Sequence, residues 1–331
     1  MSVEEILVLS AHDVAALLTI EDCITAVERA FRLYGEGNAL APAVLSLHVP
    51  GGGFHVKAGV LDSSRTYFAA KVNGNFPGNP VHFGLPTIQG VIALYDAEKG
   101  SPLAVMDSRE VTSIRTAAAS AVAAKYLARP DSSTLTICGC GIQGRVQSRA
   151  IAAVCRIGKI FLYDKNHEQA VRLSHTLFDD CGMQVTPVSD LADATIQSDI
   201  CVTCTTSREP LLGTSHVRPG TFIAAVGADN PEKHEIHPAL MASSKIVTDI
   251  VDQCAAMGDL HHALKAGTVT GDDVHAELGE IVAAKKAGRE TDDEIIIFDS
   301  TGMALQDVAA AAAVYEKAQR QGLGIRLNLA A

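Results

Sequence analysis

The segment Thr134-Leu-Thr-Ile-Cys138 is short, apolar and rich in β-branched residues, which is typical of a buried strand. It runs directly into Gly139-Cys-Gly-Ile-Gln-Gly144, and an Ala-rich, helix-favouring segment then continues to Cys155. A second strand-like run, Lys159-Ile-Phe-Leu-Tyr163, ends at Asp164, twenty residues beyond the last glycine of the turn. Strand, glycine turn, helix, strand and acid in this order predict a dinucleotide-binding unit.

Each part of this unit has a physical role. The glycines permit a tight turn and let the backbone approach a pyrophosphate, while the N-terminus of the helix offers N–H groups and a partial positive charge. Asp164 can accept hydrogen bonds from the ribose 2′-hydroxyl, and its carboxylate would repel a 2′-phosphate. NAD(H) is therefore the favoured cofactor, and NADP(H) is left open because Lys165 lies beside the acid.

Strands and helices continue to alternate beyond this unit, which predicts a doubly wound parallel sheet. Three of the predicted strands run into polar segments, at Cys204–Ser207, Gly227–Glu235 and Asp299–Gly302. Ligands of open α/β sheets bind at the carboxyl ends of the strands. We therefore expect Asp229 and residues 300–302 near the nicotinamide.

The N-terminal part of the chain has a different texture. Two short helices are followed by strand-like runs with Gly, Pro and Asn between them, which predict an antiparallel sheet packed on helices. Ser108 is predicted to cap a long Ala-rich helix, and a second Ala-rich helix, Met303 to about Gln321, has an apolar pattern that suits packing on the N-terminal part. The predicted strands are Val44–Val49, Phe54–Leu61, Tyr67–Val72, Thr87–Tyr95 and Pro102–Met106.

Length, charge and hydropathy limit the classes of protein to which the chain can belong. A chain of 331 residues is long enough for two domains, and a formal charge of −11 argues against nucleic acid or an anionic membrane surface as a partner. No apolar run reaches the roughly 18 residues that span a bilayer. The start, Met1-Ser-Val-Glu-Glu-Ile6, lacks the basic and apolar regions of a signal peptide, so we expect a cytoplasmic protein.

Cysteine and acid clusters raise the question of a metal site. The pairs Cys138/Cys140 and Cys201/Cys204 fall in predicted core strands or their turns, and no second CxxC or histidine pair stands at zinc spacing. We interpret these cysteines as reduced core thiols and predict no metal. One charged group is interpreted as solvated helix surface; it consists of Asp249, Asp252, Asp259, His261 and His262.

Two charged residues have more than one interpretation from the residues alone. Arg115 lies among Ala, Thr and Ser, where a guanidinium has room to bind a carboxylate through two hydrogen bonds. The alternative is a surface arginine with a local partner. Asp229 is either a catalytic acid or a cap or turn residue before Pro231.

Six motifs follow one another along nearly the whole chain. They are Lys71-Val-Asn-Gly-Asn-Phe-Pro77, Leu85-Pro-Thr-Ile-Gln-Gly90, Arg115-Thr-Ala-Ala-Ala-Ser120, Gly139-Cys-Gly-Ile-Gln-Gly144, Gly227-Ala-Asp-Asn-Pro-Glu-Lys233 and Phe298-Asp-Ser-Thr-Gly302. Together they resemble the ornithine cyclodeaminase/μ-crystallin family. The resemblance implies an α/β fold with a doubly wound Rossmann NAD(P)-binding domain, 116–302, and an α+β substrate-binding and dimerisation domain with an antiparallel sheet, 1–115 with 303–331. It also implies a homodimer.

The family chemistry is hydride exchange between a nicotinamide and the α-carbon of an amino acid or its imine. By resemblance, Lys71 and Arg115 match the residues that bind the substrate α-carboxylate, and Asp229 matches the aspartate that handles the proton on nitrogen. Lys71 is expected to share in catalysis, and Gly302 to contact the substrate. Cofactor contacts are expected at Thr87, Gly139, Gly141, Ile142, Gln143, Gly144, Asp164, Thr205, Lys233 and Ser300.

The chain departs from the family pattern before and within the second predicted strand. Ala41-Pro-Ala43 stands where the family usually has a carboxylate-binding arginine, and Gly53-Phe-His-Val-Lys57 replaces the acid that meets the distal amine of a diamino acid. Lys57 can then serve as a carboxylate ligand and His55 can meet the substrate side chain. The alternative is that both are surface residues on one face of a strand.

Three functions follow from these observations. The first is NAD(P)H-dependent reduction of a small α-imino acid or cyclic ketimine to the L-amino acid, with amino-acid dehydrogenation as the reverse, and the departures favour it. The second is an ornithine cyclodeaminase, which forms proline and ammonia with recycled NAD. The third is a non-catalytic, μ-crystallin-like binding protein, against which the intact Lys71, Arg115 and Asp229 argue.

Overall fold

The computed structural model describes residues 5–40, 42–62, 65–181 and 184–329, so that residues 1–4 and Ala41, which enter the interpretations above, lie outside the described part. The chain divides into two compact units. The terminal unit consists of residues 1–115 and 303–331, and the central unit of residues 116–302. Helix α4 (Ser108–Leu127) contains the boundary between them.

The terminal unit is built on a seven-stranded sheet. Strands β2 to β6 are antiparallel neighbours, as predicted, but β1 is parallel to β6 and pairs antiparallel with β15, so the sheet is mixed. The sequence did not predict β1 or β15, because their pairing joins the two ends of the chain and no local pattern connects those ends. In spatial order the strands are β15 (Ile325–Asn328), β1 (Glu5–Leu9), β6 (Pro102–Asp107), β5 (Ile88–Asp96), β4 (Thr66–Asn75), β3 (Gly52–Asp62) and β2 (Ala43–Val49).

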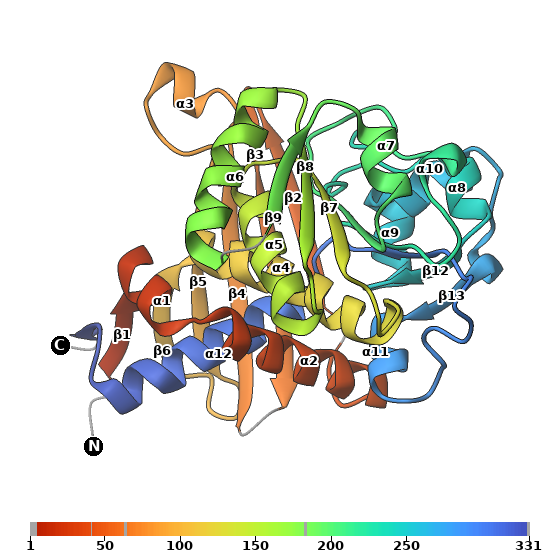
Figure 1. Ribbon diagram of the computed structural model, residues 1–331. Helices are drawn as coiled ribbons and strands as arrows, with labels where there is room; N and C mark the ends of the chain where they lie inside the picture. Colours follow the sequence, from red (N-terminus) through yellow and green to blue (C-terminus); the bar gives the residue numbers. More distant parts are fainter. Residues whose placement is uncertain (1–4, 41, 63–64, 182–183, 330–331) are drawn as a thin grey trace. The chain divides into compact units, whose positions relative to one another are not determined.

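Helix α12 (Ala304–Gln321) packs on β3, β4 and β5, with α2 (Ile20–Glu36) beside it (Figure 1). Gly59 of β3 allows α12 to approach the sheet closely, because a Cβ at this position would lie 2.9 Å from Cδ2 of Leu305. The apolar pattern of this helix therefore predicted its packing correctly. The unit also contains two short helices, α1 (Ala11–Leu17) and α3 (Asn79–His82).

The predicted cap of α4 was wrong by one residue. Asp107 fills this role, because its Oδ1 accepts a hydrogen bond from the backbone N–H of Arg109 at 2.9 Å. Ser108 is instead buried, and its hydroxyl donates to Oδ1 of Asn73 at 2.6 Å. Adjacent aspartate and serine are both good capping residues, so local sequence alone did not separate them.

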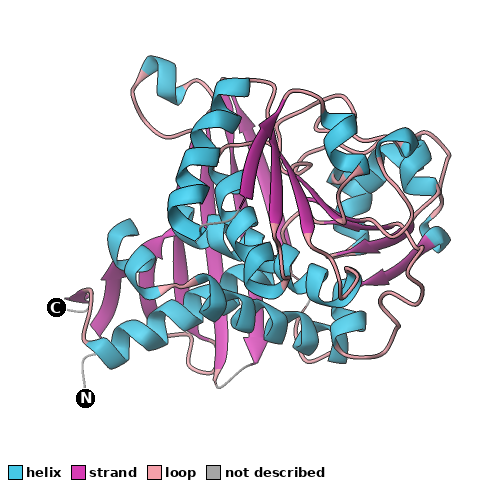
Figure 2. Cartoon of the chain, in the orientation of Figure 1, coloured by secondary structure: helices cyan, strands magenta, loops and turns pink. Residues whose placement is uncertain are grey.

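The central unit contains an eight-stranded sheet in which every pairing is parallel, with helices in the connections (Figure 2). In spatial order its strands are β13 (Val274–Glu277), β12 (Lys245–Thr248), β14 (Ile296–Asp299), β11 (Phe222–Ala225), β10 (Ile200–Thr203), β7 (Thr134–Cys138), β8 (Lys159–Tyr163) and β9 (Gln184–Val188). Its helices are α5 (Ile142–Val154), α6 (His167–Cys181), α7 (Leu191–Ile196), α8 (Pro238–Ala242), α9 (Val251–Met257), α10 (Asp259–Lys265) and α11 (Leu278–Val282).

The strand order reverses between β7 and β10. The chain runs from β7 outward to β8 and β9 and then returns to β10 on the other side of β7. The carboxyl ends of strands at such a reversal form the crevice in which α/β sheets bind ligands. The predicted α/β fold with a Rossmann-type sheet is therefore confirmed. Among the described residues, no helix combines the length and the apolar character needed to cross a membrane.

Candidate functional site

The turn after β7 consists of three glycines under different constraints. Gly139 has a φ of +102°, and a Cβ on Gly144 would lie 2.2 Å from the carbonyl oxygen of Gly139. Gly141 faces open space, since a Cβ there would meet no described atom within 4 Å. Gly141 is also the N-cap of α5, so the N–H groups of Ile142 and Gln143 lie at the helix end where a phosphate would bind.

Asp164 directly follows β8 and supports the same turn. Its Oδ2 accepts a hydrogen bond from the backbone N–H of Cys140 at 2.8 Å, and its Oδ1 accepts one from Asn166 at 2.9 Å. Each carboxylate oxygen can accept a further hydrogen bond. The acid is thus held beside the glycine turn.

Thr205, at the reversal point after β10, is bound by Glu235. The backbone N–H and the hydroxyl of Thr205 donate to Oε1 of this glutamate at 2.6 and 2.7 Å, and the N–H of Gly227 donates to Oε2 at 2.9 Å. Glu235 is fully buried, and burial raises the pKa of its carboxyl. It ties the loops after β10 and β11 together, a role that the sequence did not reveal.

Asp229 and Lys233, both predicted site residues, form an ion pair with Oδ1 and Nζ 2.7 Å apart. The side chain of Asp229 is half exposed and that of Lys233 is largely buried. The carbonyl of Lys233 accepts from the Nε2 side of His262 at 2.8 Å, and the ring of His262 stacks on His234 with centroids 3.9 Å apart. The contacts of His262 thus support this segment, while the Asp229 carboxylate is half exposed.

Ser300 and Gly302 are fixed by Asp249. The hydroxyl of Ser300 donates to Oδ2 of Asp249 at 3.2 Å, and the N–H of Gly302 donates to the same atom at 2.6 Å. Asp249 is fully buried, so its interpretation as part of a solvated helix surface was wrong. It organises the loop after β14.

Two further acids support the same edge of the sheet. Asp299 accepts hydrogen bonds from the N–H groups of Asp259 and Leu260, and Asp259 accepts from those of Glu235 and Ile236. Burial raises the pKa of Asp299 to about 7 and also raises that of Asp259. Asp259 too was wrongly interpreted as surface. These acids hold loops in place through backbone N–H groups.

In the terminal unit, Lys71 and Arg115 meet on one carboxylate. Lys71 Nζ lies 2.8 Å from Oδ1 of Asp307, and Arg115 Nε donates to the same oxygen at 2.9 Å. All three residues are buried. Arg115 also donates through Nη1 to Oε1 of Gln306 at 2.9 Å. Arg115 is therefore not a surface arginine, and its partners come from the first turn of α12.

Burial governs the charge state of this cluster. It lowers the pKa of Lys71 to about 7, with Asp307 acting in the opposite direction. Burial also opposes ionisation of Asp307, but Arg115 and Lys71 outweigh it and hold the pKa of Asp307 below its ordinary value. The cluster is thus a carboxylate held between two cations, one of which titrates near neutral pH.

Lys57 and His55 both lie on β3, the strand that pairs with the Lys71 strand β4. In the antiparallel pair of β3 and β4, Lys57 is opposite Lys71 and His55 is opposite Asn73. The Nδ1 of His55 lies 3.0 Å from the hydroxyl of Ser46 on β2. Both side chains are partly buried on the face of β3 that also carries Gly59, the face on which α12 packs.

Asp307 was missed by the sequence interpretation. A signal was present, since Gln306-Asp307 is a polar pair within an otherwise apolar, Ala-rich run. Of the predicted cofactor residues, Thr87 lies in the terminal unit, just before β5, whereas the others lie in the central unit.

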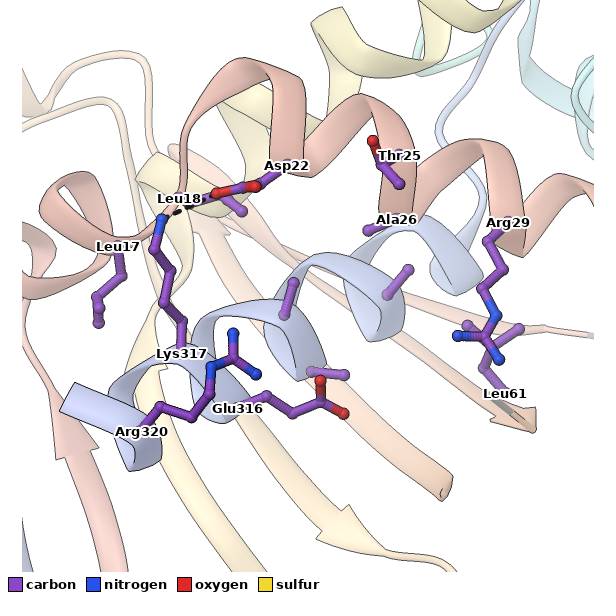
Figure 3. Close-up of a pocket in the computed structure, with 13 residues that line it drawn as sticks. Leu17, Leu18, Asp22, Thr25, Ala26, Arg29, Leu61, Glu316, Lys317 and Arg320 are labelled. Atoms are coloured by element: carbon purple, nitrogen blue, oxygen red, sulfur yellow. Dashed lines mark hydrogen bonds and ion pairs between the residues drawn. The ribbon is translucent and has the colours of Figure 1, made fainter. Parts of the chain in front are cut away.

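A cavity of about 340 Å³ opens between α2 and α12 in the terminal unit (Figure 3). Its charged lining includes Arg29, Glu316 and Arg320, together with Asp22 and Lys317, whose ion pair measures 2.9 Å. None of the predicted site residues lines it. We therefore do not assign the substrate to this cavity.

In the described part of the chain, no group of three His, Cys, Asp or Glu side chains is placed to hold a metal ion. Cys138, Cys140 and Cys201 are buried and free, and burial raises the pKa of the Cys140 thiol to about 12. The prediction that these three cysteines are core residues is confirmed.

Comparison with known proteins assigns the family. The model of the ornithine cyclodeaminase/mu-crystallin family matches residues 4–322. The chain belongs to this family. It is 39% identical over 324 residues to the alanine dehydrogenase of Archaeoglobus fulgidus, with 98% of each chain covered. It is 36% identical to the iminosuccinate reductase of Paracoccus denitrificans, covering 98% of this chain and all of that protein (100%).

Solved structures of family members match the whole fold. An archaeal alanine dehydrogenase dimer with bound NAD has a TM-score of 0.94 at 38% identity, covering 98% of this chain and 99% of that one. The Δ1-pyrroline-2-carboxylate reductase of Thermococcus litoralis, in complex with NADH and L-proline, has a TM-score of 0.92 at 34% identity, covering 97% and 100%.

Proposed function

We propose that this protein is an NAD(H)-dependent reductase of a small α-imino acid, acyclic or cyclic, that runs in reverse as an L-amino-acid dehydrogenase. The observation that carries the proposal is the buried pair of Lys71 and Arg115, two cations that share one carboxylate. Family members of high similarity are named as alanine dehydrogenase, iminosuccinate reductase and Δ1-pyrroline-2-carboxylate reductase, all of which exchange hydride at an α-carbon.

The central unit fits a nicotinamide dinucleotide. The open space at Gly141 and the N-terminus of α5 suit a pyrophosphate, and Asp164 suits a ribose with a free 2′-hydroxyl. NAD(H) is therefore the cofactor that we assign, in keeping with the relatives whose structures contain NAD or NADH. Gln143, Thr205, Lys233 and Ser300, together with Thr87 of the terminal unit, are the side chains that we assign to it.

In this proposal Lys71 and Arg115 bind the α-carboxylate and so fix the position of the imine carbon. NADH, when bound, supplies the hydride that forms the new C–H bond as the C=N π bond breaks. Asp229, directly or through one water, delivers the proton that the nitrogen needs. The balance is imino acid, NADH and one proton on one side, and L-amino acid with NAD⁺ on the other.

The same residues argue against an ornithine cyclodeaminase. Ornithine carries a distal ammonium group, and Lys57 lies opposite Lys71 on the sheet face that we assign to the substrate. A second cation there disfavours a cationic side chain through like-charge repulsion. Intact Lys71, Arg115 and Asp229 argue equally against a purely binding role.

We further propose that the protein is a cytoplasmic homodimer. Exposed apolar side chains, among them Leu45 and Leu47, cover one face of β2. Contiguous exposed apolar surface of this kind marks a protein interface. The free, buried thiols suit a reducing compartment.

The test is a panel of NADH-oxidation assays with 2-oxo acids plus ammonia or methylamine and with pyrroline-2-carboxylate. L-Ornithine with catalytic NAD is run alongside and scored for proline and ammonia. We expect NADH consumption with at least one imine. Proline formed from ornithine without a net change in NADH would show that the protein is a cyclodeaminase and not a reductase. Saturable binding of an imino acid without turnover would show that it is a binding protein.

A further inference from the structure

Helix α10 binds the backbone just beyond the ion pair of Asp229 and Lys233. In its first turn, Asp259 accepts hydrogen bonds through Oδ1 from the two N–H groups of residues 235–236, at 2.8 and 2.9 Å. Three positions later, His262 lies with its Nε2 2.8 Å from the carbonyl oxygen of Lys233. Because positions i and i+3 share one face of a helix, a single face of α10 fixes three backbone groups of this segment.

The ring of His262 is held by two separate interactions. A carbonyl oxygen only accepts hydrogen bonds, so the Nε2 of His262 must carry the hydrogen that Lys233 receives. The ring also stacks on that of His234, with centroids 3.9 Å apart and planes 10° apart. The Nε2 of His234 lies in turn 2.9 Å from the carbonyl oxygen of Ile236. His262 therefore cannot move away from Lys233 without losing both the hydrogen bond and the stacking contact.

Lys233 is bound at three points. Its carbonyl is bound by His262, its N–H donates to the carbonyl of Asn230 at 3.1 Å, and its Nζ lies 2.7 Å from Oδ1 of Asp229. The Nδ2 of Asn230 lies 3.3 Å from the same carboxylate oxygen. Residues 229 to 233 thus form one hydrogen-bonded turn, in which a displacement of the Lys233 carbonyl would be passed to the Asp229 carboxylate.

The side chain of Asp229 depends on these polar contacts for its position. It is half exposed, so packing holds it less firmly than it would hold a buried acid. Proton delivery needs the donor within hydrogen-bond reach of the nitrogen, and a misplacement of about 1 Å can slow a reaction about a hundredfold. A contact that fixes the far end of the turn therefore bears on the rate.

We propose that His262 is a positioning residue for the reaction. Through the carbonyl of Lys233 it holds the Asp229–Lys233 pair in the place from which Asp229 delivers its proton. His262 acts through these residues and is assigned no contact with the substrate or the cofactor. The proposal rests on the reductase function above and adds a residue to its machinery.

The first experiment separates the hydrogen bond of His262 from its stacking contact. His262→Phe keeps a ring that can stack on His234 but has no N–H group, whereas His262→Gln lacks the ring and can place an amide N–H close to the position of Nε2. With the imine that reacts best, we expect kcat to fall by about tenfold to a hundredfold in His262→Phe and to stay within about threefold of the parent value in His262→Gln. KM for the imino acid should change little in both, because its carboxylate is assigned to Lys71 and Arg115. A role that depends on stacking alone predicts the opposite order of kcat.

Two further variants control for folding and for the helix itself. His262→Asn carries an amide that is one methylene shorter than that of glutamine, so its kcat should fall as in His262→Phe, and it replaces that variant if phenylalanine prevents folding. His261→Phe is the matched control, because it removes a similar hydrogen bond of the same helix, between Nδ1 and the carbonyl of Ala255 at 3.0 Å. Its kcat should equal that of the parent. Thermal melts of every variant allow kcat to be expressed per folded protein.

The second experiment asks whether His262 acts through Asp229. In the double variant Asp229→Asn, His262→Phe, the second change should lower the single-turnover rate by no more than about twofold, because the group that His262 positions is already absent. In a protein where His262 only stabilises the central unit, the two losses would multiply.

The outcomes distinguish this proposal from the function on which it rests. Full kcat in His262→Phe, or losses that multiply in the double variant, would overturn the positioning role and leave the reductase intact. A parent protein that turns over no imino or amino acid would remove the proposed function itself.

Discussion

Asp307 is the residue on which both buried cations of the terminal unit depend. A carboxylate at this position favours the protonated form of Lys71 and holds the side chains of Lys71 and Arg115 on one oxygen. Because Lys71 must be protonated to bind a carboxylate, the affinity for substrate should be present below the Lys71 pKa of about 7 and decline as pH rises through it.

Asp307→Asn tests this dependence. Loss of the negative charge removes the group that favours protonated Lys71, so the Lys71 pKa falls further. The alkaline limb of kcat/KM should then move to lower pH, and KM for the imino acid should rise by about tenfold or more at neutral pH. Pre-steady-state or steady-state profiles from mildly acidic to mildly alkaline pH measure both effects.

Asp22→Asn is the matched control, since it breaks the exposed ion pair with Lys317 in the same unit. Its pH profile should equal that of the unaltered protein. If Asp307→Asn also leaves the profile in place, the proposed link between Asp307 and Lys71 is wrong.

Asp229→Asn tests the assigned proton donor. The amide keeps the size of the side chain but cannot transfer the proton, so turnover should fall by about 10² to 10⁴ while NADH affinity changes little. NADH affinity is measured by calorimetry. Glu232→Gln, an exposed acid of the same segment that pairs with Arg208 at 2.8 Å, should retain full turnover. Activity of Asp229→Asn within a few-fold of the parent protein would remove the assigned role.

Single residues also show the limit of reading a site from sequence. Lys71 and Arg115 were identified through motifs, and their partner Asp307 was not, because it is 192 positions from Arg115 and no local spacing links the two. Glu235 ends the predicted polar segment Gly227–Glu235, but its role depends on contacts with Thr205 and Gly227 that the sequence does not indicate. Carboxylates such as these bind loops that are distant in the sequence, so their role is visible only in the folded chain.

At the scale of elements, the strand–turn–helix unit of β7 and α5 was predictable because its contacts are local. Its glycines have different roles, one in packing and one in cofactor binding, and two variants distinguish these roles. Gly144→Ala places a Cβ 2.2 Å from the carbonyl oxygen of Gly139, so it should lower the melting temperature by several degrees.

Gly141→Ala meets no described atom within 4 Å and should leave the melting temperature nearly unchanged. It should still weaken NAD binding, because the methyl group enters the open space assigned to the pyrophosphate. Thermal melts with and without NAD measure both variants. A Gly141→Ala protein that binds NAD as tightly as the parent would place the pyrophosphate elsewhere.

Elements that depend on distant partners were less predictable. Strand β1 lies between β15 and β6 and so joins the two ends of the chain in one sheet. Neither β1 nor β15 was expected, and the predicted antiparallel sheet is in fact mixed. Short strands such as β13 were missed for the same reason. The predicted strands that the structure confirms are those with long alternating or apolar runs and turn residues on both sides.

At the scale of the whole molecule, the exposed face of β2 predicts the oligomeric state. Leu45 and Leu47 expose 53% and 54% of their surface, which is unfavourable for a monomer in water. We expect a dimer in sedimentation experiments and a monomer for the double variant Leu45→Lys, Leu47→Lys. A parent protein that sediments as a monomer at micromolar concentration would contradict the proposed interface.

The proposed function depends on direct hydride exchange at the α-carbon of an amino acid, and isotope transfer measures this step. The protein is incubated with NADH deuterated at C4 on either face, ammonia and a panel of 2-oxo acids, and the amino-acid product is analysed by mass spectrometry and NMR. We predict one deuterium at the α-carbon from one of the two labelled cofactors, with one NAD formed for each amino acid. Amino acid formed without deuterium from either cofactor, or no amino acid from any 2-oxo acid, would show that the protein does not carry out this hydride exchange.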